Sequence, residues 1–430
     1  MWWLSSVSMR SHESGNIRVL AVIGAGHVGL VTAVGFSHHG HRVRVGEADP
    51  GRLAALTAGT APFIEPGLTP MIAEGVASGL LTFHSDNGEA ASGAAAIFIA
   101  VPTPADIDGS ADLSAVESAV RSIAPGVAPG AAVVIKSSVP PGSWRSIGAW
   151  MEDAGCPGSL VINPEFLQEG NALAGVLEPA RVVVGSLDPA AADLVAGLHE
   201  PMGVPVVRTT PASAELIKYA ANAYLAMRVT FANSMANLAE EVGADIADVL
   251  RGVGLDPRIG MRFFSPGPGY GGSCFPKDLP ALIVAAREHG LELDLIEAVV
   301  KVNSRQPQRV VAKLRHGLGT IRGRRVALWG LAFKAGTDDV RESRAIGVVA
   351  ALLEEGAQVR AYDPAAMGRF ESLFPHITYA SPREILESDA ILILTDWQEF
   401  SELDYSGKTV IDGRRILKAR EAKIYEGVCW

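Results

Sequence analysis

The segment at residues 267–278, with the sequence GPGYGGSCFPKD, combines a single cysteine with several glycines and a Lys-Asp pair. Glycine lets the backbone approach a ligand closely and adopt positive φ. Cys274 is a candidate nucleophile, because a nearby cation such as Lys277 favours the thiolate, the form that attacks carbon. Asp278 is placed to hold a proton or to steer a water molecule. The alternative is an inert buried cysteine. Motifs elsewhere in the chain are needed to distinguish a nucleophile from an inert cysteine.

The elements expected around residues 18–46 alternate as strand, turn, helix and strand. Residues 18–23 are a short apolar run that predicts a buried parallel strand, residues 30–39 have helical periodicity, and residues 42–46 are expected to form the next strand. A GxGxxG motif, GAGHVG at residues 24–29, fills the first turn. In this context the motif predicts a dinucleotide site, because the helix N-terminus supplies amide donors and the positive end of a dipole.

Each residue of this motif has an expected role. Gly24 permits the tight turn, Gly26 lets a pyrophosphate approach, and Gly29 allows close packing of helix on strand. Glu47 follows the second strand, where an acid binds the ribose hydroxyls. Such an acid favours NAD over NADP, whose extra phosphate it would repel. The alternative is a doubly wound sheet that binds no dinucleotide.

Further strands alternate with helices, which predicts a parallel sheet in an α/β fold. These strands are expected at residues 95–101, 132–136, 160–162 and 180–184. Ligands of such sheets sit beyond the carboxyl ends of the strands. Two polar loops fall there, VPTP at 101–104 and NPEFLQEG at 163–170.

Residues 211–243 predict one helix of about 30 residues that stops at Gly243. Glu215, Lys218, Asn222 and Leu225 fall three or four positions apart, so they share a face. A lysine on a helix is usually solvated, so Lys218 alone predicts no site. A helix of this length suits a link between domains or a dimer contact.

A second, smaller α/β unit is expected towards the C-terminus. Its elements are a strand from 324, a helix at 343–355 and strands at 358–362, 390–395 and 409–412. This unit lacks a full GxGxxG motif. We therefore expect it to bind a different ligand from the first unit.

The chain has 430 residues and a formal net charge of −10, which argues against general binding of nucleic acid, since that requires a basic face. Its three cysteines, Cys156, Cys274 and Cys429, are odd in number and sparse, which predicts a reducing cytoplasm rather than a disulfide framework.

No metal site is expected, because the histidines at 38, 39 and 41 lack carboxylate or thiol partners, and we interpret them as solvated. No apolar run is long enough for a membrane span. Residues 1–16 are expected to be a disordered extension.

Seven motifs, between about residues 17 and 417, resemble those of the UDP-glucose/GDP-mannose dehydrogenase family. In chain order they are GAGHVGL at 24–30, VPTP at 101–104, NPEFLQEG at 163–170, KYAANAY at 218–224, the Cys274 loop, FKAGTDDVRES at 333–343 and DGR at 412–414. Within the family, the Cys274 loop is most similar to the UDP-glucose branch.

The resemblance implies three parts: an NAD-binding Rossmann domain at 17–211, a central helical dimerisation domain at 212–316 and a UDP-sugar-binding Rossmann-like domain at 317–430. It also implies a homodimer. The implied reaction is the four-electron oxidation of UDP-glucose to UDP-glucuronate with two NAD.

The resemblance also implies residue roles in that reaction. Lys218 and Asn222 would stabilise the alkoxide, and Cys274 would form a thiohemiacetal and then a thioester. The residues implied for the hydrolytic water are Asp278, Glu165 and Thr103. Those implied for NAD are Gly24, Gly26, His27, Val28, Gly29, Glu47, Arg52, Thr103, Ser138, Glu169, Lys277 and Arg341. Those implied for the nucleotide-sugar are Glu165, Phe166, Leu167, Lys218, Asn222, Arg258, Phe263, Tyr270, Gly271, Lys334 and Arg414.

Departures from the family pattern are few. Glu47 replaces the usual Asp, and Ser138 keeps a hydroxyl where Thr is common. Ser265 stands where some members have Lys, and this puts one sugar contact in doubt. Arg258 would act across the dimer.

Three rival functions remain open at this point. The same chemistry could act on GDP-mannose or on another UDP-hexose. A thiol hydrolase or acyl transferase would use Cys274 without NAD, but Glu47 and the glycine motif argue against it. A nucleotide-sugar sensor would need no nucleophile.

Overall fold

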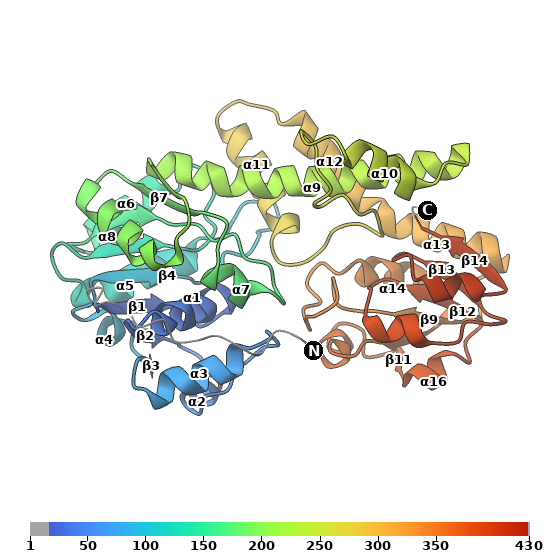
Figure 1. Cartoon of the computed structure of the whole chain (residues 1–430), viewed down its shortest axis with the longest axis horizontal. Coiled ribbons are helices and arrows are strands. Elements are labelled where there is room, and N and C mark those ends of the chain that lie inside the picture. Colours follow the sequence, from blue (N-terminus) through green and yellow to red (C-terminus); the bar gives the residue numbers. More distant parts are fainter. Residues whose placement is uncertain (1–16, 429–430) are drawn as a thin grey trace.

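The structure is a computed structural model that describes residues 17–428, so the expected extension at 1–16 and Cys429 lie outside the described residues. Two α/β units lie side by side, and one long helix spans both (Figure 1). The N-terminal unit contains an eight-stranded sheet, and the C-terminal unit contains a six-stranded sheet.

The N-terminal sheet has the order β3-β2-β1-β4-β5-β6-β7-β8. Its strands are β1 (Val19–Ile23), β2 (Arg42–Gly46), β3 (Leu81–His84), β4 (Ala96–Ile99), β5 (Ala132–Ile135), β6 (Ser159–Ile162), β7 (Val182–Ser186) and β8 (Val206–Thr209). The central strands β4 and β5 are buried along their whole length. This explains their continuous apolar sequence, because helices cover both faces of a parallel sheet.

The helices of this unit connect successive strands. They are α1 (His27–His38), α2 (Pro50–Thr57), α3 (Leu68–Ala77), α4 (Asn87–Ala91), α5 (Ser114–Ile123), α6 (Trp144–Asp153), α7 (Ala172–Leu177) and α8 (Pro189–Leu198). The order reverses between β1 and β4, and both strands end beside the glycine turn. Such a switch point is where ligands bind in this class of fold.

The prediction of a fully parallel sheet is wrong at β7, which pairs antiparallel with β6. The connection between them contains only α7, a helix of 6 residues. At 1.5 Å per residue this helix is about 9 Å long, too short to return the chain to the opposite edge of the sheet. The chain therefore enters β7 from the same edge of the sheet at which β6 ends and the loop at 163–170 begins.

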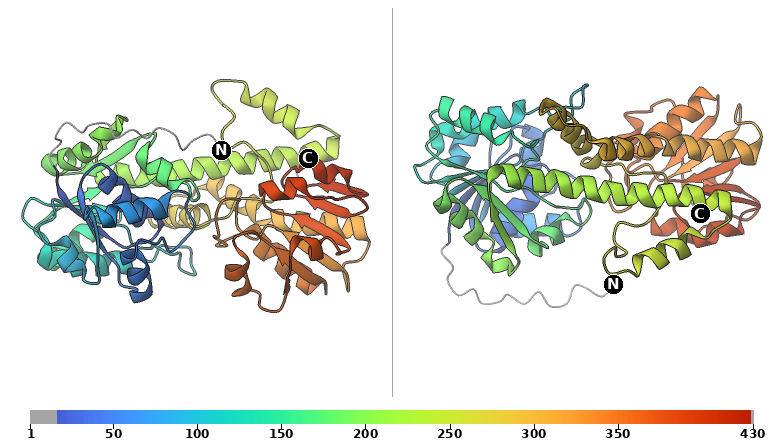
Figure 2. Two further views of the ribbon diagram at one scale, coloured as in Figure 1. Left: turned by 60° about the horizontal axis from the view of Figure 1, so that its bottom comes forward. Right: turned by 90° about the horizontal axis from the view of Figure 1, so that it is seen from above.

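The predicted long helix is confirmed as α9 (Pro211–Val242), which ends at Gly243 in the left-handed conformation with φ 72°. Seen from above, α9 runs across both units (Figure 2). The other central helices are α10 (Ile246–Gly254), α11 (Phe275–Glu288), α12 (Asp294–Ser304) and α13 (Gln306–Leu318). Helices α11 and α12 pack on α9.

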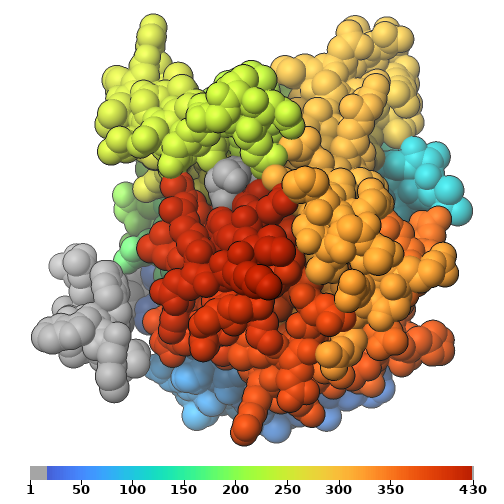
Figure 3. All heavy atoms as spheres, turned by 90° about the vertical axis from the view of Figure 1, so that its right-hand side faces the viewer, coloured from blue at the N-terminus to red at the C-terminus, as the bar shows by residue number. Residues whose placement is uncertain are grey.

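The C-terminal sheet has the order β11-β10-β9-β12-β13-β14, which repeats the order of the first six strands. Its strands are β9 (Arg325–Trp329), β10 (Gln358–Tyr362), β11 (Thr378–Tyr379), β12 (Ala390–Ile393), β13 (Thr409–Asp412) and β14 (Ile424–Gly427). Its helices are α14 (Arg344–Glu354), α15 (Met367–Glu371) and α16 (Pro382–Ile385). This unit forms one end of the molecule, above which the segment around α10 projects in yellow-green (Figure 3).

The turn after β9 explains why the second unit differs from the first. Gly330 has φ 95°, like Gly24 with φ 96°. The buried Asp363 carboxylate, after β10, accepts hydrogen bonds from the backbone N–H groups of Leu331 and Ala332 at 2.8 and 3.0 Å. A side chain of the protein thus takes both amides of this turn, whereas in the first turn Glu47 accepts from the Ala25 N–H.

One of the three N-terminal histidines does not match its expected environment. His41 is buried, and its Nδ1 accepts a hydrogen bond from the Arg18 backbone N–H at 3.3 Å. It packs against this unit because the turn at Gly40 brings it beside Phe36. Within residues 17–428, no helix is long and apolar enough to cross a membrane, and no group of three His, Cys, Asp or Glu could hold a metal ion.

Candidate active site

The Cys274 loop is held by two asparagines from different helices. The Asn233 side chain, on α9, accepts from the Gly267 N–H at 2.8 Å. The Asn303 side chain, on α12, accepts from the Tyr270 N–H at 2.8 Å and donates to the Tyr270 carbonyl at 3.1 Å. These bonds fix a loop that has no regular structure of its own.

The glycines of this loop allow the C-terminal unit to approach. A Cβ on Gly271 would lie 2.2 Å from the Glu342 carbonyl oxygen, and one on Gly272 would lie 2.8 Å from the Phe333 ring. The Gly272 N–H donates to the Arg341 carbonyl at 3.0 Å. The glycine density seen in the sequence therefore serves contact between the loop and the C-terminal unit.

Cys274 directly precedes α11, with its Sγ 3.6 Å from Ser273 Oγ. Burial and the Glu165 and Asp278 carboxylates together raise the pKa of the thiol to about 11, and Lys218 opposes them. The resting thiol is therefore neutral at pH 7. It becomes a nucleophile only if local positive charge offsets the carboxylates.

Lys277 does not have the role predicted from its spacing. Its Nζ donates to Asp278 Oδ1 at 2.6 Å and to Thr103 Oγ1 at 3.5 Å, so its charge pairs with the neighbouring carboxylate. Lys218, which comes from α9, is a cation that lowers the pKa of the thiol.

Lys218 and Glu165 form a buried ion pair, with 2.8 Å between Nζ and Oε1. Only 2% of Lys218 is exposed. Burial would lower the pKa of Lys218, but the nearby Glu165, Cys274 and Asp278 outweigh it and raise the pKa. Lys218 is therefore a permanent cation beside the thiol.

Asp278 is the second buried carboxylate of the site. Its Oδ2 accepts from Asn222 Nδ2 at 2.6 Å, and its other oxygen accepts from Lys277. Thr103 Oγ1 donates to the Ser138 carbonyl at 2.9 Å. Strand ends, α9 and α11 thus bring Thr103, Asn222 and Asp278 together around one point.

The glycine turn has the shape that a dinucleotide requires. A Cβ on Gly24 would lie 2.8 Å from the Ala100 carbonyl oxygen, and one on Gly29 would lie 1.9 Å from the Gly24 carbonyl oxygen. A Cβ on Gly26 would have no described atom within 4 Å, so this face of the turn is open. No side chain caps the helix that follows, so its first amides face the open side.

Glu47 lies at the end of β2 against this turn. One of its oxygens accepts from the Ala25 N–H at 3.2 Å and from Arg52 at 3.1 Å, and the other accepts from the Asp49 N–H at 2.8 Å. Glu47 is buried, with only 6% of the residue exposed. The carboxylate is thus fixed beside the open side of the turn, with lone pairs left for hydroxyl donors.

His27 and Glu169 line the side that faces the C-terminal unit. The His27 ring stacks on Phe63 at 3.6 Å, and burial with nearby Arg341 lowers its pKa to about 4. Its Nε2 is buried without a hydrogen-bond partner among residues 17–428. Glu169 accepts from Ser273 Oγ at 2.6 Å and from Arg341 at 3.1 Å. An orphaned nitrogen beside an open glycine turn fits a bound polar ligand.

The remaining residues expected at the nucleotide-sugar lie at different depths. The Arg181 guanidinium lies over the Phe166 ring, with its Cζ 3.7 Å from the ring centroid. Leu167 packs against the N-terminal core. Arg414 lies beside Gly267, whose added Cβ would be 3.2 Å from its Nη1. Burial lowers the pKa of Lys334, and the nearby Glu169 carboxylate only partly opposes this.

Two residues are not brought to the thiol. The Arg258 side chain is 88% exposed and pairs with Asp256. Phe263 has an unusual backbone, with φ 56°, but the structure gives it no contact with Cys274. The role of Arg258 across a dimer stays a prediction.

Comparison with known proteins agrees with this geometry. The UDP-glucose/GDP-mannose dehydrogenase family matches in three parts: its NAD binding domain at residues 18–203, its central domain at 212–305 and its UDP binding domain at 327–419. The chain belongs to the UDP-glucose/GDP-mannose dehydrogenase family.

Relatives within this family match nearly the whole chain. A UDP-glucose 6-dehydrogenase of Rhizobium meliloti (strain 1021) is 43% identical over 90% of this chain and 91% of its own. The UDP-glucose 6-dehydrogenase AglM of Haloferax volcanii is 41% identical over 95% and 99%. A UDP-glucose dehydrogenase structure from Pyrobaculum islandicum has a TM-score of 0.94 and 42% identity, covering 97% and 99%.

The family confirms the predicted fold class and NAD as cofactor, and the open turn at Gly26 with Glu47 beside it fits that cofactor. The expected domain limits, 17–211, 212–316 and 317–430, stay predictions.

Sequence reasoning missed two residues that support the site. Glu65 lies after α2, and its carboxylate accepts from the backbone N–H groups of Gly170 at 2.9 Å and Ala172 at 2.8 Å. Lys136 lies at the end of β5 and donates to Asn163 Oδ1 at 3.0 Å. Neither forms a motif with its sequence neighbours. The only signal in the sequence was a charged residue at the end of an apolar strand, at Lys136.

Proposed function

We propose that this enzyme oxidises UDP-glucose to UDP-glucuronate in two NAD-dependent steps, through a covalent intermediate on Cys274. The observation that carries the proposal is the buried Lys218–Glu165 pair beside the Cys274 thiol. A cation, a carboxylate and a thiol in one water-poor place suit oxidation of an alcohol followed by capture of the aldehyde. The UDP-glucose 6-dehydrogenases among the relatives support the substrate.

NAD would lie on the glycine turn, with its pyrophosphate at Gly26 and a ribose at Glu47. The cofactor accepts a hydride in each of the two oxidations. His27 and Glu169 both lie close to Arg341 of the C-terminal unit, and they would help to orient the cofactor.

In the first oxidation, Lys218 would stabilise the negative charge that develops on the substrate oxygen as its proton leaves. The buried cation is already in place, so little reorganisation is needed. Asn222 gives one N–H to Asp278 and retains a second for the same oxygen.

Cys274 then adds to the aldehyde carbon. A C–S bond forms, and the thiol proton passes to the carbonyl oxygen, which gives a thiohemiacetal. Lys218 again supports the oxygen. The second oxidation converts this adduct to a thioester.

Hydrolysis requires a water molecule near the thioester carbon. Glu165 and Asp278 are the carboxylates close to the thiol, and Thr103 Oγ1 lies beside Lys277. We assign these groups to hold the water and take its proton. The C–S bond breaks, the sulfur regains a proton, and the carboxylate product leaves.

The UDP part of the substrate would contact Lys334 and Arg414, since both are cations near the Cys274 loop.

The test is the amount of NADH formed per UDP-glucose consumed, for the wild type, Cys274→Ser and the control Cys156→Ser. Cys156 lies in the N-terminal unit, outside the site. We expect a ratio of about two for the wild type and the control, as a four-electron oxidation requires, with loss of net turnover for Cys274→Ser. A wild-type ratio near one would reject the thioester. Turnover of GDP-mannose but not of UDP-glucose would reject UDP-glucose as the substrate.

We also propose a homodimer and a cytoplasmic enzyme. Tyr224, Phe231 and Leu238 are exposed on α9 at heptad spacing, and such a stripe suits contact between helices. Light scattering should give twice the chain mass for the wild type and a lower mass for Leu238→Lys. An unchanged mass in that variant would reject this surface as the dimer contact.

The cytoplasmic location is supported by the described cysteines, which are free, as is usual for proteins in a reducing compartment.

A further inference from the structure

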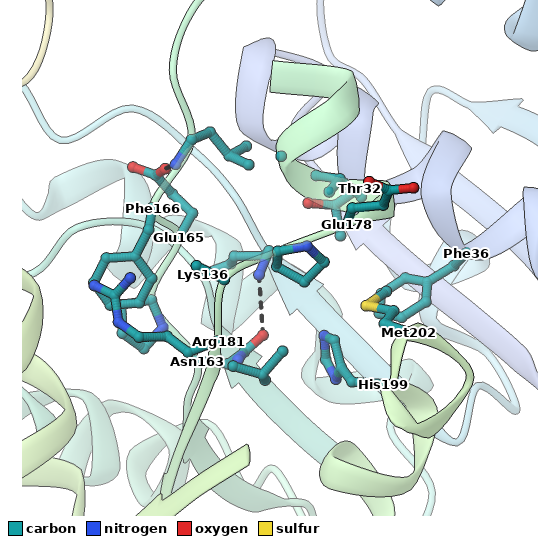
Figure 4. Close-up of a pocket in the computed structure, with 17 residues that line it drawn as sticks. Thr32, Phe36, Lys136, Asn163, Glu165, Phe166, Glu178, Arg181, His199 and Met202 are labelled. Carbon is teal, nitrogen blue, oxygen red and sulfur yellow. Dashed lines mark hydrogen bonds between the residues drawn. The ribbon is translucent and has the colours of Figure 1, made fainter. Parts of the chain in front are cut away.

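A cavity of about 120 Å³ lies behind the loop that carries Glu165 (Figure 4). Its polar wall includes Lys136, Asn163, Glu165, Arg181 and His199, and its apolar wall includes Phe36. A space of this size has room for several water molecules. Because Glu165 lines this cavity, water in the cavity would lie beside Glu165.

Lys136 is held at this cavity by directed contacts. It follows β5 and is buried, and its Nζ donates to Asn163 Oδ1 at 3.0 Å, the bond drawn in Figure 4. Asn163 in turn donates to the Val183 carbonyl at 2.7 Å. Lys136 thus reaches the start of the loop, two positions before Glu165.

The charge on Lys136 acts on Glu165. Burial would raise the pKa of Glu165, but Lys218, the Leu167 N–H and Lys136 outweigh it and hold the pKa below its usual value. Burial lowers the pKa of Lys136 to about 8, Glu165 opposes this, and Lys218 adds to it. Glu165 therefore has two cations, of which only Lys218 faces the thiol.

The other titratable groups that face Lys136 do not replace its charge. Burial and the charge on Lys136 lower the pKa of His199 to about 4, so His199 is neutral. Arg181 lies over the Phe166 ring, and Glu178 lines the same cavity. Lys136 is the cation hydrogen-bonded to the strand end that leads to Glu165.

We propose that Lys136 is a positioning residue that keeps the Glu165 carboxylate ionised and aligned while Lys218 is engaged by the substrate oxygen. The inference rests on the proposed function, in which Lys218 stabilises that oxygen and Glu165 takes a proton from the hydrolytic water. When Lys218 binds the substrate oxygen, it offsets less of the negative charge on Glu165. The second cation prevents the carboxylate from binding a proton too early.

The test compares Lys136→Gln, Lys136→Met and the control Thr32→Val. Gln keeps an N–H donor and removes the charge, whereas Met removes both. Thr32 lines the same cavity, and within the described chain its Oγ1 has no hydrogen-bond partner, so Val changes only the hydroxyl. The readouts are the pH profile of NADH formation and the mass of acid-quenched enzyme, which reports the thioester on Cys274.

We expect both Lys136 variants to accumulate the thioester at pH 7, with turnover about tenfold lower, which corresponds to a one-unit change of pKa. Loss of Lys136 raises the pKa of Glu165, so the acid limb of the profile should move to higher pH. Thr32→Val should match the wild type. Unchanged acid limbs and no thioester in either Lys136 variant would overturn the proposal, and a lower Tm alone would then mark a purely structural lysine.

A second measurement needs no substrate. In a double-mutant cycle on Tm at pH 7, Lys136→Gln and Glu165→Gln should together lower Tm by less than the sum of the single effects, because the two charges interact. Additive effects would contradict the proposed electrostatic interaction between Lys136 and Glu165. If the wild type forms no NADH from UDP-glucose, the proposed function fails, and this cycle still tests the role of Lys136.

Discussion

Lys218 Nζ lies 2.8 Å from Glu165 Oε1, although the two residues are 53 positions apart and come from α9 and from the loop after β6. Both side chains are almost fully buried. A buried pair of this kind contributes little net stability as a pair, but loss of one partner leaves an isolated charge. The pair thus couples the chemistry of the site to the stability of the fold.

Lys218→Met should abolish turnover and also destabilise the protein by about 3–5 kcal/mol, because Glu165 stays behind as an unpaired buried charge. Addition of Glu165→Gln should restore part of that stability and none of the activity. Denaturant unfolding of the single and double variants measures both effects. Lys301→Met, at an exposed position of α12, is the matched control. A double variant less stable than Lys218→Met would refute the isolated charge as the cause.

Glu47→Gln should raise the KM for NAD about tenfold and leave the KM for UDP-glucose unchanged, since about 1.4 kcal/mol of charged hydrogen bonding to the ribose is lost. Initial rates at varied NAD and fixed sugar provide the measurement. Glu117→Gln, on the surface of α5, should leave both constants unchanged. An equal change in both KM values would mean that Glu47 supports the fold rather than the cofactor.

Glu65→Gln should lower Tm and raise the KM values for both substrates. The Glu65 carboxylate accepts three backbone N–H groups, from Gly170, Ala172 and Leu173, and a neutral amide would be expected to weaken these bonds. The free energy of unfolding should fall by about 1–3 kcal/mol. Glu74→Gln, exposed on α3, is the control. If kinetics remained normal despite a lower Tm, Glu65 would not position the loop for function.

Glu215 makes stability depend on pH. Burial raises its pKa from 4.5 to about 7, against hydrogen bonds from the Gly142 and Trp144 N–H groups. The folded state therefore binds this proton more tightly than the unfolded state does. The associated stability is present in full below pH 4.5 and is lost as pH rises to about 7.

Glu215→Gln should consequently reduce the fall in Tm between pH 5 and pH 8 relative to the wild type. Thermal unfolding at four pH values would measure the slopes. Parallel curves for the two proteins would show that Glu215 titrates normally. The comparison uses the difference between proteins, so groups that titrate in both cancel.

Local signals predicted most of the elements well. Strand β12 is a short apolar run, β10 alternates buried residues with more exposed ones, and α9 ends at a glycine, so neighbours in sequence determine these elements. The direction of β7 could not be predicted, because it depends on how far α7 carries the chain through space.

The site was predicted less completely, for a physical reason. Motifs indicated Cys274, Lys218 and Asp278, but charge partners are set by folding, and the sequence offered Lys277 as the cation for the thiol. The structure gives Lys277 to Asp278 and brings Lys218 from a distant helix instead. Glu65 was missed because the amides it binds lie about a hundred positions further along the chain.

Helix α9 sets an angular relation between the two ends of the site. It carries Lys218 and Asn222 towards one end and Asn233, which holds the Cys274 loop, further along its 32 residues. With 3.6 residues per turn, one residue inserted between Asn222 and Asn233 would rotate everything beyond it by about 100°. Lys218 and Asn233 would then face different directions, although no side chain of the site had been changed. In the evolution of such enzymes, this stretch of helix should tolerate substitution far more readily than a change of length.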